Sequence, residues 1–183
     1  HTWSDVDTQR DVGFFGFSDA LEAHYRAATS QIFADAGYRI DTQLAAFEPF
    51  ANLALIKVDR GEFRENGGPA ALSGAAMDND LRLSSLGARV SHEFVAGGME
   101  MTATGAISWQ HASGDVTPEA SLNFSGSDPF GISGLPVARD AISIDAGMGT
   151  QLSENLRLGI SYTGQFGGGS KDQGMRANLS MSF

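Results

Sequence analysis

Residues 156–166 read LRLGISYTGQF, and apolar and polar side chains alternate along this stretch. The even positions from Leu156 to Phe166 are apolar or glycine, while the odd positions from Arg157 to Gln165 are polar or glycine. Side chains on a β-strand point alternately to its two faces, so this period of two residues predicts a strand with two unlike faces. The stretch is also longer than the ~5–6 residues that are usual for strands in soluble sheets.

The same alternation recurs along most of the chain and strengthens toward the C-terminus. It is clear over residues 99–110, 138–152 and 173–183, and weaker over residues 47–58 and 80–94. We find no helical period that competes with it. We therefore predict an all-β antiparallel fold of about eight strands, at residues 1–6, 19–40, 47–58, 80–94, 99–111, 138–152, 155–166 and 173–183.

One predicted strand changes its apolar parity partway along. Leu21, Ala23 and Tyr25 are apolar at odd positions, whereas Ile32 and Ala34 are apolar at even positions. A β-bulge would shift the parity by one residue, and a break between two strands would do the same. We favour a bulge between residues 27 and 32.

The predicted connections between the strands differ in length in an ordered way. Short ones fall at residues 41–46, 95–98 and 153–155. Longer polar ones fall at residues 7–18, 59–79 and 112–137, and a brief glycine-rich one falls at residues 167–172. In an up-and-down meander, this order places the short turns at one end of the sheet and the longer loops at the other.

Composition excludes several classes of function. The chain has 183 residues, with 22 acidic against 12 basic side chains and a net charge of −10. This balance argues against a nucleic-acid partner, because phosphate binding needs a basic surface. The absence of cysteine excludes disulfides, thiolate metal sites and cysteine nucleophiles. No run of ~18 apolar residues occurs, so we expect no transmembrane helix.

Alternation alone does not distinguish a soluble lipocalin-like barrel, which is apolar inside, from a membrane barrel, which is apolar outside. The polar face here mixes small and charged residues, as the hydrated lumen of a membrane barrel does. The strands are long enough to cross a bilayer at a tilt, and short turns gather at one end. These features favour a transmembrane β-barrel, because only a closed sheet satisfies its backbone groups in hydrocarbon.

The candidate site residues are architectural. The polar face carries side chains that we predict to line a lumen: Arg39, Glu100, Arg157, Gln165 and Arg176. Aromatic residues near strand ends are predicted to form a girdle at the membrane interface: Tyr38, Phe94, Trp109 and Tyr162.

We expect no metal ion, no cofactor and no catalytic residue. The four histidines, at positions 1, 24, 92 and 111, are not at metal-ligand spacing. The chain has no GxSxG elbow for a serine nucleophile. The GGGS stretch at residues 167–170 lacks the rest of a phosphate loop, and no calcium-binding loop follows residues 78–80.

The succession of stretches resembles the autotransporter β-domain, the translocator of type V secretion in Gram-negative bacteria. The resemblance is carried, in order, by residues 1–40, FEPFANLALIKVD at 47–59, ALSGAAMDNDLRLSSLGARVSHEF at 71–94, ISWQHASGDVTPEASLNF at 107–124, PVARDAISIDAGMGTQLSENLRLGISYTGQF at 136–166 and ANLSMSF at 177–183. It covers essentially the whole chain, although no single stretch is diagnostic. The last strand looks like the C-terminal signal that the barrel-insertion machinery reads, with apolar side chains at Met175, Ala177, Leu179, Met181 and Phe183.

The resemblance implies an up-and-down β-barrel in the bacterial outer membrane that helps to export an N-terminal passenger and is not an enzyme. Family members have twelve strands and a linker helix in the pore. The eight strands here would be the last eight, and residues 1–183 would form one N-terminally truncated domain. The expected partners are outer-membrane lipid, the insertion machinery, and the upstream passenger and linker helix. Some members cleave their passenger with a linker residue, and no such residue is carried over to this chain.

Two alternatives remain open at this point. One is a complete eight-stranded outer-membrane barrel that acts as an anchor or adhesin, with an interior wide enough only for side chains or one small ligand. The other is a soluble lipocalin-like binder of a small apolar ligand. The first strand, at residues 1–6, reads as the end of a longer strand, and this favours the truncated translocator over both.

Overall fold

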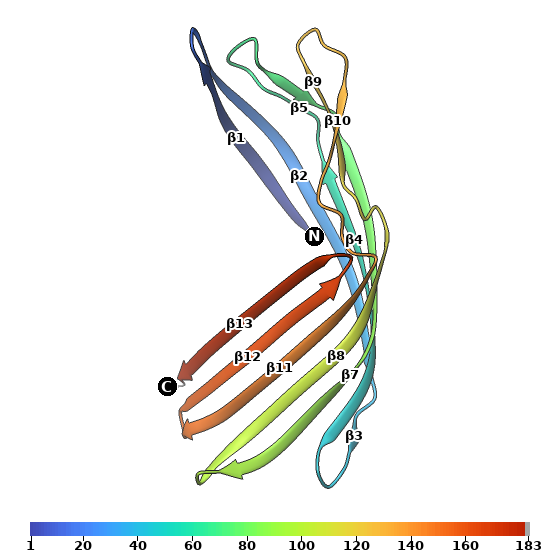
Figure 1. The fold of residues 1–183 in the computed structure, drawn as a ribbon, viewed down its shortest axis with the longest axis vertical. Helices are drawn as coiled ribbons and strands as arrows, with labels where there is room; N and C mark the ends of the chain where they lie inside the picture. The colour runs from blue at the N-terminus through green and yellow to red at the C-terminus, as the bar shows by residue number, and fades with distance from the viewer. Residues whose placement is uncertain (182–183) are drawn as a thin grey trace. The chain divides into compact units, whose positions relative to one another are not determined.

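The computed structural model describes residues 1–181, and the regular elements within them are β-strands (Figure 1). Eight strands are long: β1 (Thr2–Phe14), β2 (Phe17–Gly37), β4 (Ala46–Arg60), β7 (Met77–Ala96), β8 (Met99–Gly114), β11 (Asp140–Ser153), β12 (Leu156–Gly167) and β13 (Ser170–Met181). Five are short: β3 (Ile40–Asp41), β5 (Phe63–Arg64), β6 (Leu72–Gly74), β9 (Glu119–Phe124) and β10 (Phe130–Ser133). Within residues 1–181, no helix is long and apolar enough to cross a membrane.

The long strands form one sheet in chain order. That order is β1-β2-β4-β7-β8-β11-β12-β13, and β3 pairs with β4 beside it. The described pairings of β1 with β2, β8 with β11, β11 with β12 and β12 with β13 are all antiparallel. The predicted all-β antiparallel fold of about eight long strands is therefore confirmed. Closure between β1 and β13, the two ends of this order, is not detected within residues 1–181.

The remaining short strands form a second, four-stranded sheet in the order β10-β9-β6-β5, here called the small sheet. Its strands β5 and β6 lie in the connection between β4 and β7, and β9 and β10 lie in the connection between β8 and β11. The two connections join where Leu72 pairs with Phe124 and Gly74 pairs with Leu122. Segments that the sequence predicts as polar loops thus contain ordered strands.

The chain divides into two compact units. Unit 1 contains residues 1–32, 55–82 and 113–137, and so includes β1, most of β2 and the small sheet. Unit 2 contains residues 33–54, 83–112 and the chain from residue 138 onward, and so includes most of β8 and all of β11 and β12. The strands β2, β4, β7 and β8 contribute residues to both units.

The first hairpin differs from the prediction of a strand at residues 1–6 and a polar loop at residues 7–18. In the structure β1 continues to Phe14, which pairs with Phe17 of β2. The connection is the two-residue turn Phe15–Gly16, where Gly16 has a φ of 82°, a conformation that favours glycine. The prediction is wrong because residues 7–11 are polar at both odd and even positions, so no apolar alternation marks this part of the strand.

The predicted order of short and long connections is wrong in the same place. The connections at Gly97–Gly98 and Glu154–Asn155 are short, as expected. The connections between β4 and β7 and between β8 and β11 are long, also as expected. The first connection, however, is a tight turn like the one at Gly168–Gly169.

The parity change on β2 does not come from a strand break, because β2 is continuous from Phe17 to Gly37. Its pairing with β1 is regular from Phe17 to Thr29, so no bulge occurs in this part of the strand. Near its start, the odd residue Leu21 is buried, and Gly67 of the segment between β5 and β6 lies against it. Farther along, the odd residue Asp35 pairs with Arg89, and the even residue Ile32 is exposed. The apolar parity therefore changes because the surroundings of the strand change along its length.

Few large apolar side chains are buried in the described residues. Leu21 is the one large side chain within residues 1–181 that is fully buried. Ile107, Ile160 and Leu179, by contrast, are each more than half exposed. Apolar surface of this extent indicates contact with an apolar phase or partner.

Candidate functional site: the polar face of the long sheet

The strands of unit 2 align apolar residues into rows across the sheet. Met148 of β11 pairs with Ala103 of β8 on one side and with Ile160 of β12 on the other. Ile160 in turn pairs with Ala177 of β13. Ile160 is 53% exposed, so this row presents apolar surface.

The next row along the same strands is polar or small. Gly147 of β11 pairs with Thr104 of β8 and with Ser161 of β12, and Ser161 pairs with Arg176 of β13. Successive residues on a strand point to opposite faces, so the two rows lie on opposite sides of the sheet. In these two rows, the pairing register keeps apolar residues with apolar ones and polar or small residues with polar ones.

The polar face of unit 2 is hollowed. One hollow has a volume of about 320 Å³, and its polar lining includes Arg39, Glu48, Arg89, Thr104, Asp145 and Thr163. Charges of both signs therefore lie around one concave surface. Such a surface can bind a polypeptide segment that carries charges of both signs, or hold ordered water.

Arg89 of β7 is the centre of the charge network in this hollow. Its Nη1 donates to Glu48 Oε1 at 2.7 Å, and its Nη2 donates to Asp35 Oδ2 at 3.2 Å. Its guanidinium carbon lies 3.8 Å from the centroid of the Phe50 ring, a cation–π contact. Three contacts from β2 and β4 thus fix the position of the charge.

The Phe50 ring occupies space that Gly87 leaves free. A Cβ atom at Gly87 would lie 2.9 Å from Phe50 Cε1 and 2.4 Å from the carbonyl oxygen of Ile107. No side chain fits there, so the ring packs directly against the backbone of β7. Arg89 therefore stacks on a Phe50 ring that lies close to the backbone of the sheet.

The five predicted lumenal residues all lie on or beside this polar face. Glu100 and Arg157 line a second hollow of about 460 Å³, and Arg39 lines the first. Gln165 donates from Nε2 to Gln110 Oε1 at 2.8 Å, and Arg176 pairs across the strands with Ser161, which lines both hollows. Their role in a lumen stays a prediction.

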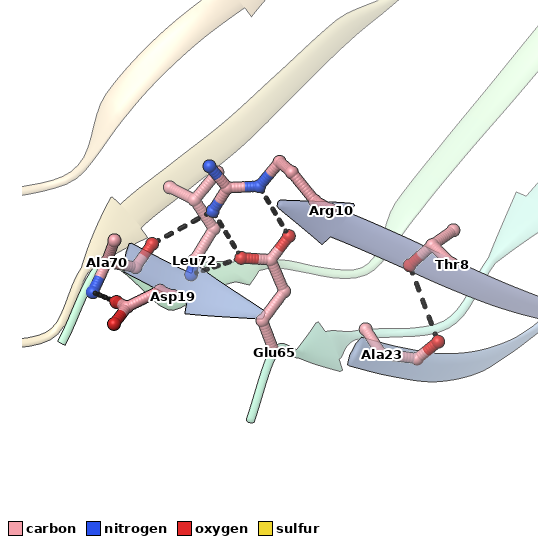
Figure 2. A network of polar contacts seen from close by, with 7 residues as sticks. All are labelled: Thr8, Arg10, Asp19, Ala23, Glu65, Ala70 and Leu72. Atoms are coloured by element: carbon pink, nitrogen blue, oxygen red, sulfur yellow. Dashed lines mark hydrogen bonds and ion pairs between the residues drawn. The ribbon is translucent and has the colours of Figure 1, made fainter. Parts of the chain in front are cut away.

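Unit 1 fixes its small sheet with an ion pair that the sequence analysis missed (Figure 2). Arg10 of β1 donates from Nε to Oε1 of Glu65 at 3.1 Å and from Nη2 to Oε2 at 2.5 Å. Glu65 Oε2 also accepts from the Leu72 amide at 2.8 Å, and Arg10 Nη2 also donates to the Ala70 carbonyl at 2.9 Å. The hydrogen bond from Arg10 lowers the pKa of Glu65, the Leu72 amide adds to this effect, and burial opposes it.

Two further contacts hold the same connection against β2. Asp19 Oδ2 accepts from the Ala70 amide at 2.9 Å (Figure 2). The backbones of Glu22 and Asn66 exchange two hydrogen bonds of 2.9 and 2.8 Å. The buried Leu21 lies between these two contacts along β2. The connection between β4 and β7 is therefore fixed to the first hairpin at several points.

No group of three or more potential metal ligands occurs within residues 1–181. Two of the histidines instead have single acidic partners. His24 Nδ1 lies 2.7 Å from Asp7 Oδ1, and His111 Nδ1 lies 2.9 Å from Asp140 Oδ1.

Comparison with known proteins gives the family of this sheet. Residues 1–163 match the family model described as the autotransporter β-domain. The chain belongs to this family. Two curated relatives from Serratia marcescens, each named "Extracellular serine protease", are 33% and 32% identical to this chain over its whole length. The chain spans 18% of the length of each of these relatives.

As an autotransporter β-domain, the chain is an outer-membrane translocator of type V secretion. The predicted family, compartment and translocator function are confirmed by the match over residues 1–163. The prediction that the chain is not an enzyme is confirmed on the same ground, because the match assigns it to the translocator part. Membership of this family also excludes the soluble lipocalin-like alternative.

The four residues of the predicted aromatic girdle of the β-domain lie at different places along their strands. Tyr38 lies between β2 and β3, and Phe94 lies near the end of β7. Trp109 of β8 donates from Nε1 to Asp140 Oδ1 at 3.2 Å. Tyr162 lies within β12, five residues before its last residue Gly167, and Trp109 lies equally far from the last residue of β8, Gly114. That these side chains meet the membrane interface stays a prediction.

The predicted C-terminal signal falls mostly on β13. Met175, Ala177, Leu179 and Met181 occupy alternate positions of this exposed strand. Phe183 lies outside the described residues. That the insertion machinery reads this strand stays a prediction.

The sequence held a signal for one of the two missed networks of the β-domain. Arg89, Ser91 and Glu93 are polar at odd positions near the end of β7, which marks a polar face. The pair of Arg10 and Glu65 has no such signal, because it depends on how a long connection folds back onto β1.

Proposed function

We propose that this β-domain anchors and exports a serine protease passenger. The observation that carries the proposal is the 33% identity, over the whole chain, to a protein named "Extracellular serine protease". Since the chain corresponds to 18% of that protein, most of its length is free to contain a passenger and a linker. The barrel-insertion machinery is a further partner in this proposal, with the alternating residues of β13 as its signal.

In the same proposal, the polar rows of unit 2 line the translocation lumen and the apolar rows face lipid. The support is that the lining of the first hollow includes charged and hydroxyl side chains such as Arg39, Asp145 and Thr163, whereas Ile160 and Leu179 are exposed. Charged side chains on the lipid face are destabilising, and in a water-filled lumen they are not. The hollow around Arg89 would then contact the linker helix, whose charged side chains can pair with Arg39, Glu48 and Asp145.

The export proposal is tested with the full-length precursor in a Gram-negative host. We expect serine protease activity at the cell surface or in the medium, and we expect it to disappear when residues 170–183 are deleted. Deletion of β13 removes a whole strand pairing of the sheet. The control is Glu62→Gln, a change at an exposed loop residue, which should export normally. Equal external activity from the deletion variant would contradict the proposal.

The assignment of the two faces is tested with single cysteines, because the chain has none of its own. We expect Thr163→Cys, in the wall of the first hollow, to react with a water-soluble maleimide in isolated outer membranes. Ile160→Cys, on the other face of β12, should react only after detergent solubilisation. The reverse pattern of labelling would exchange the two faces and overturn the assignment.

A further inference from the structure

The turn between β1 and β2 displays three phenylalanines, Phe14, Phe15 and Phe17, here called the phenylalanine tip. Phe14 and Phe17 pair across the hairpin, and their ring centroids are 4.8 Å apart in a stacked arrangement. Phe14 is 67% exposed and Phe15 is fully exposed. Apart from chain neighbours, no described residue lies within 4 Å of a Cβ atom built on Gly13 or Gly16. The tip therefore stands clear of the rest of unit 1 (Figure 1).

The hairpin that carries the tip is held in place. Arg10 lies on β1 a few residues before Phe14, and its ion pair with Glu65 ties β1 to the small sheet. Asp19 lies on β2 just after Phe17, and it accepts from the Ala70 amide. The phenylalanine tip is therefore at the end of a fixed two-stranded stalk.

The stalk carries the phenylalanine tip beyond the reach of lipid. Arg10 faces the small sheet, so the odd residues of β1 lie on the opposite face. That face has two charge pairs, Asp5 with Arg26 and Asp7 with His24, all of them exposed. Charged side chains therefore lie on both faces of this part of the hairpin. Because charges on a lipid face are destabilising, neither face meets lipid, and this part of the hairpin is in water. From the exposed Ile32 to Phe17 at the phenylalanine tip, β2 is about 50 Å long at ~3.3 Å per residue.

The phenylalanine tip lies at the same end of unit 1 as the long connections (Figure 1). In outer-membrane barrels the short turns are periplasmic and the longer loops are outside the cell. The tip is therefore extracellular. The polypeptide that a translocator delivers to this side is its own passenger, and most of the length of the curated relatives lies outside the part that this chain matches.

We propose that the phenylalanine tip docks apolar segments of the emerging, still unfolded passenger; this inference rests on the proposed export function. Exposed aromatic side chains offer a large contact area with few rotatable bonds, so they suit binding of apolar chain with little sequence preference. The tip retains the passenger next to the outer end of the sheet. It releases the passenger once folding buries the apolar side chains that it contacts.

A photo-crosslinking amino acid placed at position 15 of the full-length precursor tests the contact directly. The probe is p-benzoylphenylalanine. The control position is Leu44, an exposed apolar residue in the turn between β3 and β4. We expect crosslinks from position 15 to passenger peptides during export, and none to the passenger from position 44. Crosslinks from position 15 only to lipopolysaccharide or to other proteins, or no crosslinks at all, would overturn the proposal.

A kinetic comparison tests the consequence of docking. The variant with Phe14→Ser, Phe15→Ser and Phe17→Ser should slow the appearance of folded passenger outside the cell by about fivefold, the effect of losing a contact of about 1 kcal/mol. The β-domain of this variant should remain folded, and its heat-modifiable mobility on electrophoresis is the readout. The control variant Leu44→Ser should export the passenger at the original rate. Export at the original rate by the triple-serine variant overturns this inference alone. If the unaltered precursor exports no passenger, the proposed function fails, and this inference fails with it.

Discussion

Ile160 and Thr163 lie close together on β12 but point to opposite faces of the sheet. Ile160 belongs to the exposed apolar row, and Thr163 lines the hollow around Arg89. If the apolar row meets lipid near the bilayer midplane, Ile160→Arg should lower the free energy of unfolding by about 2–4 kcal/mol. Thr163→Arg should cost much less, because a lumen hydrates the new charge. Unfolding titrations in lipid vesicles measure both values, and equal costs would contradict the assignment of the faces.

At the scale of the element, the stability of the small sheet of unit 1 includes a contribution from the ionised carboxylate of Glu65, which is buried. The pKa of Glu65 is lowered in the folded protein. Its pair with Arg10 therefore stabilises the small sheet fully at pH values above the ordinary glutamate pKa of about 4.3. This stabilisation is lost as the pH falls through the lower pKa of the folded protein. Glu65→Gln should remove about 1–3 kcal/mol of this local stability at neutral pH, because it deprives Arg10 of its charged partner. Hydrogen exchange at the amides of Leu72 and Ala70 reports the change.

The same experiment has a matched control and a second readout. Glu62→Gln changes an exposed glutamate in the same connection and should leave exchange at these amides unaltered. In the unaltered protein, exchange corrected for its intrinsic rate should become faster in acid, and in Glu65→Gln it should stay independent of pH. Persistent protection of Leu72 in Glu65→Gln would show that the small sheet is held without the ion pair.

Sequence patterns predict the strands whose two faces keep the same surroundings along their length. This holds for β11 and β12, where Met148 and Ile160 continue one apolar row. The alternation is weaker for β4, which is predicted at residues 47–58 and found at Ala46–Arg60, because Leu53 and Leu55 are exposed at odd positions whereas Ile56 and Val58 are less exposed at even positions. An apolar pattern that changes faces partway along a strand reads as weak alternation or as a bulge.

The elements that the sequence does not predict are those that depend on long-range contacts. Residues 7–11 form a strand because they pair with β2 and because Arg10 reaches Glu65, since they have no local apolar pattern. The small sheet likewise joins two connections that are far apart in the sequence. At the candidate site, the polar rows follow from parity, whereas the contact of Phe50 with Arg89 depends on the neighbouring strands.

At the scale of the whole molecule, the long strands are longer than a bilayer requires. A tilted transmembrane strand needs ~9–11 residues, whereas β2 has 21 and β7 has 20. A strand of this length has parts in two environments, which agrees with the change of apolar parity along β2 and β4. The described hollows all belong to single units, and those on the polar rows lie within unit 2.

The number of strands sets what these 183 residues can conduct by themselves. The interior of an eight-stranded barrel is wide enough only for side chains or one small ligand, so a path for a polypeptide needs more strands than the eight long ones described here. We therefore expect the purified 183-residue chain to give no large-conductance channels in a planar bilayer. The full-length precursor, if its β-domain has the family's twelve strands, should give them once its linker is removed. Wide, stable channels from the 183-residue chain alone would contradict the prediction that these strands are the last eight of a larger barrel.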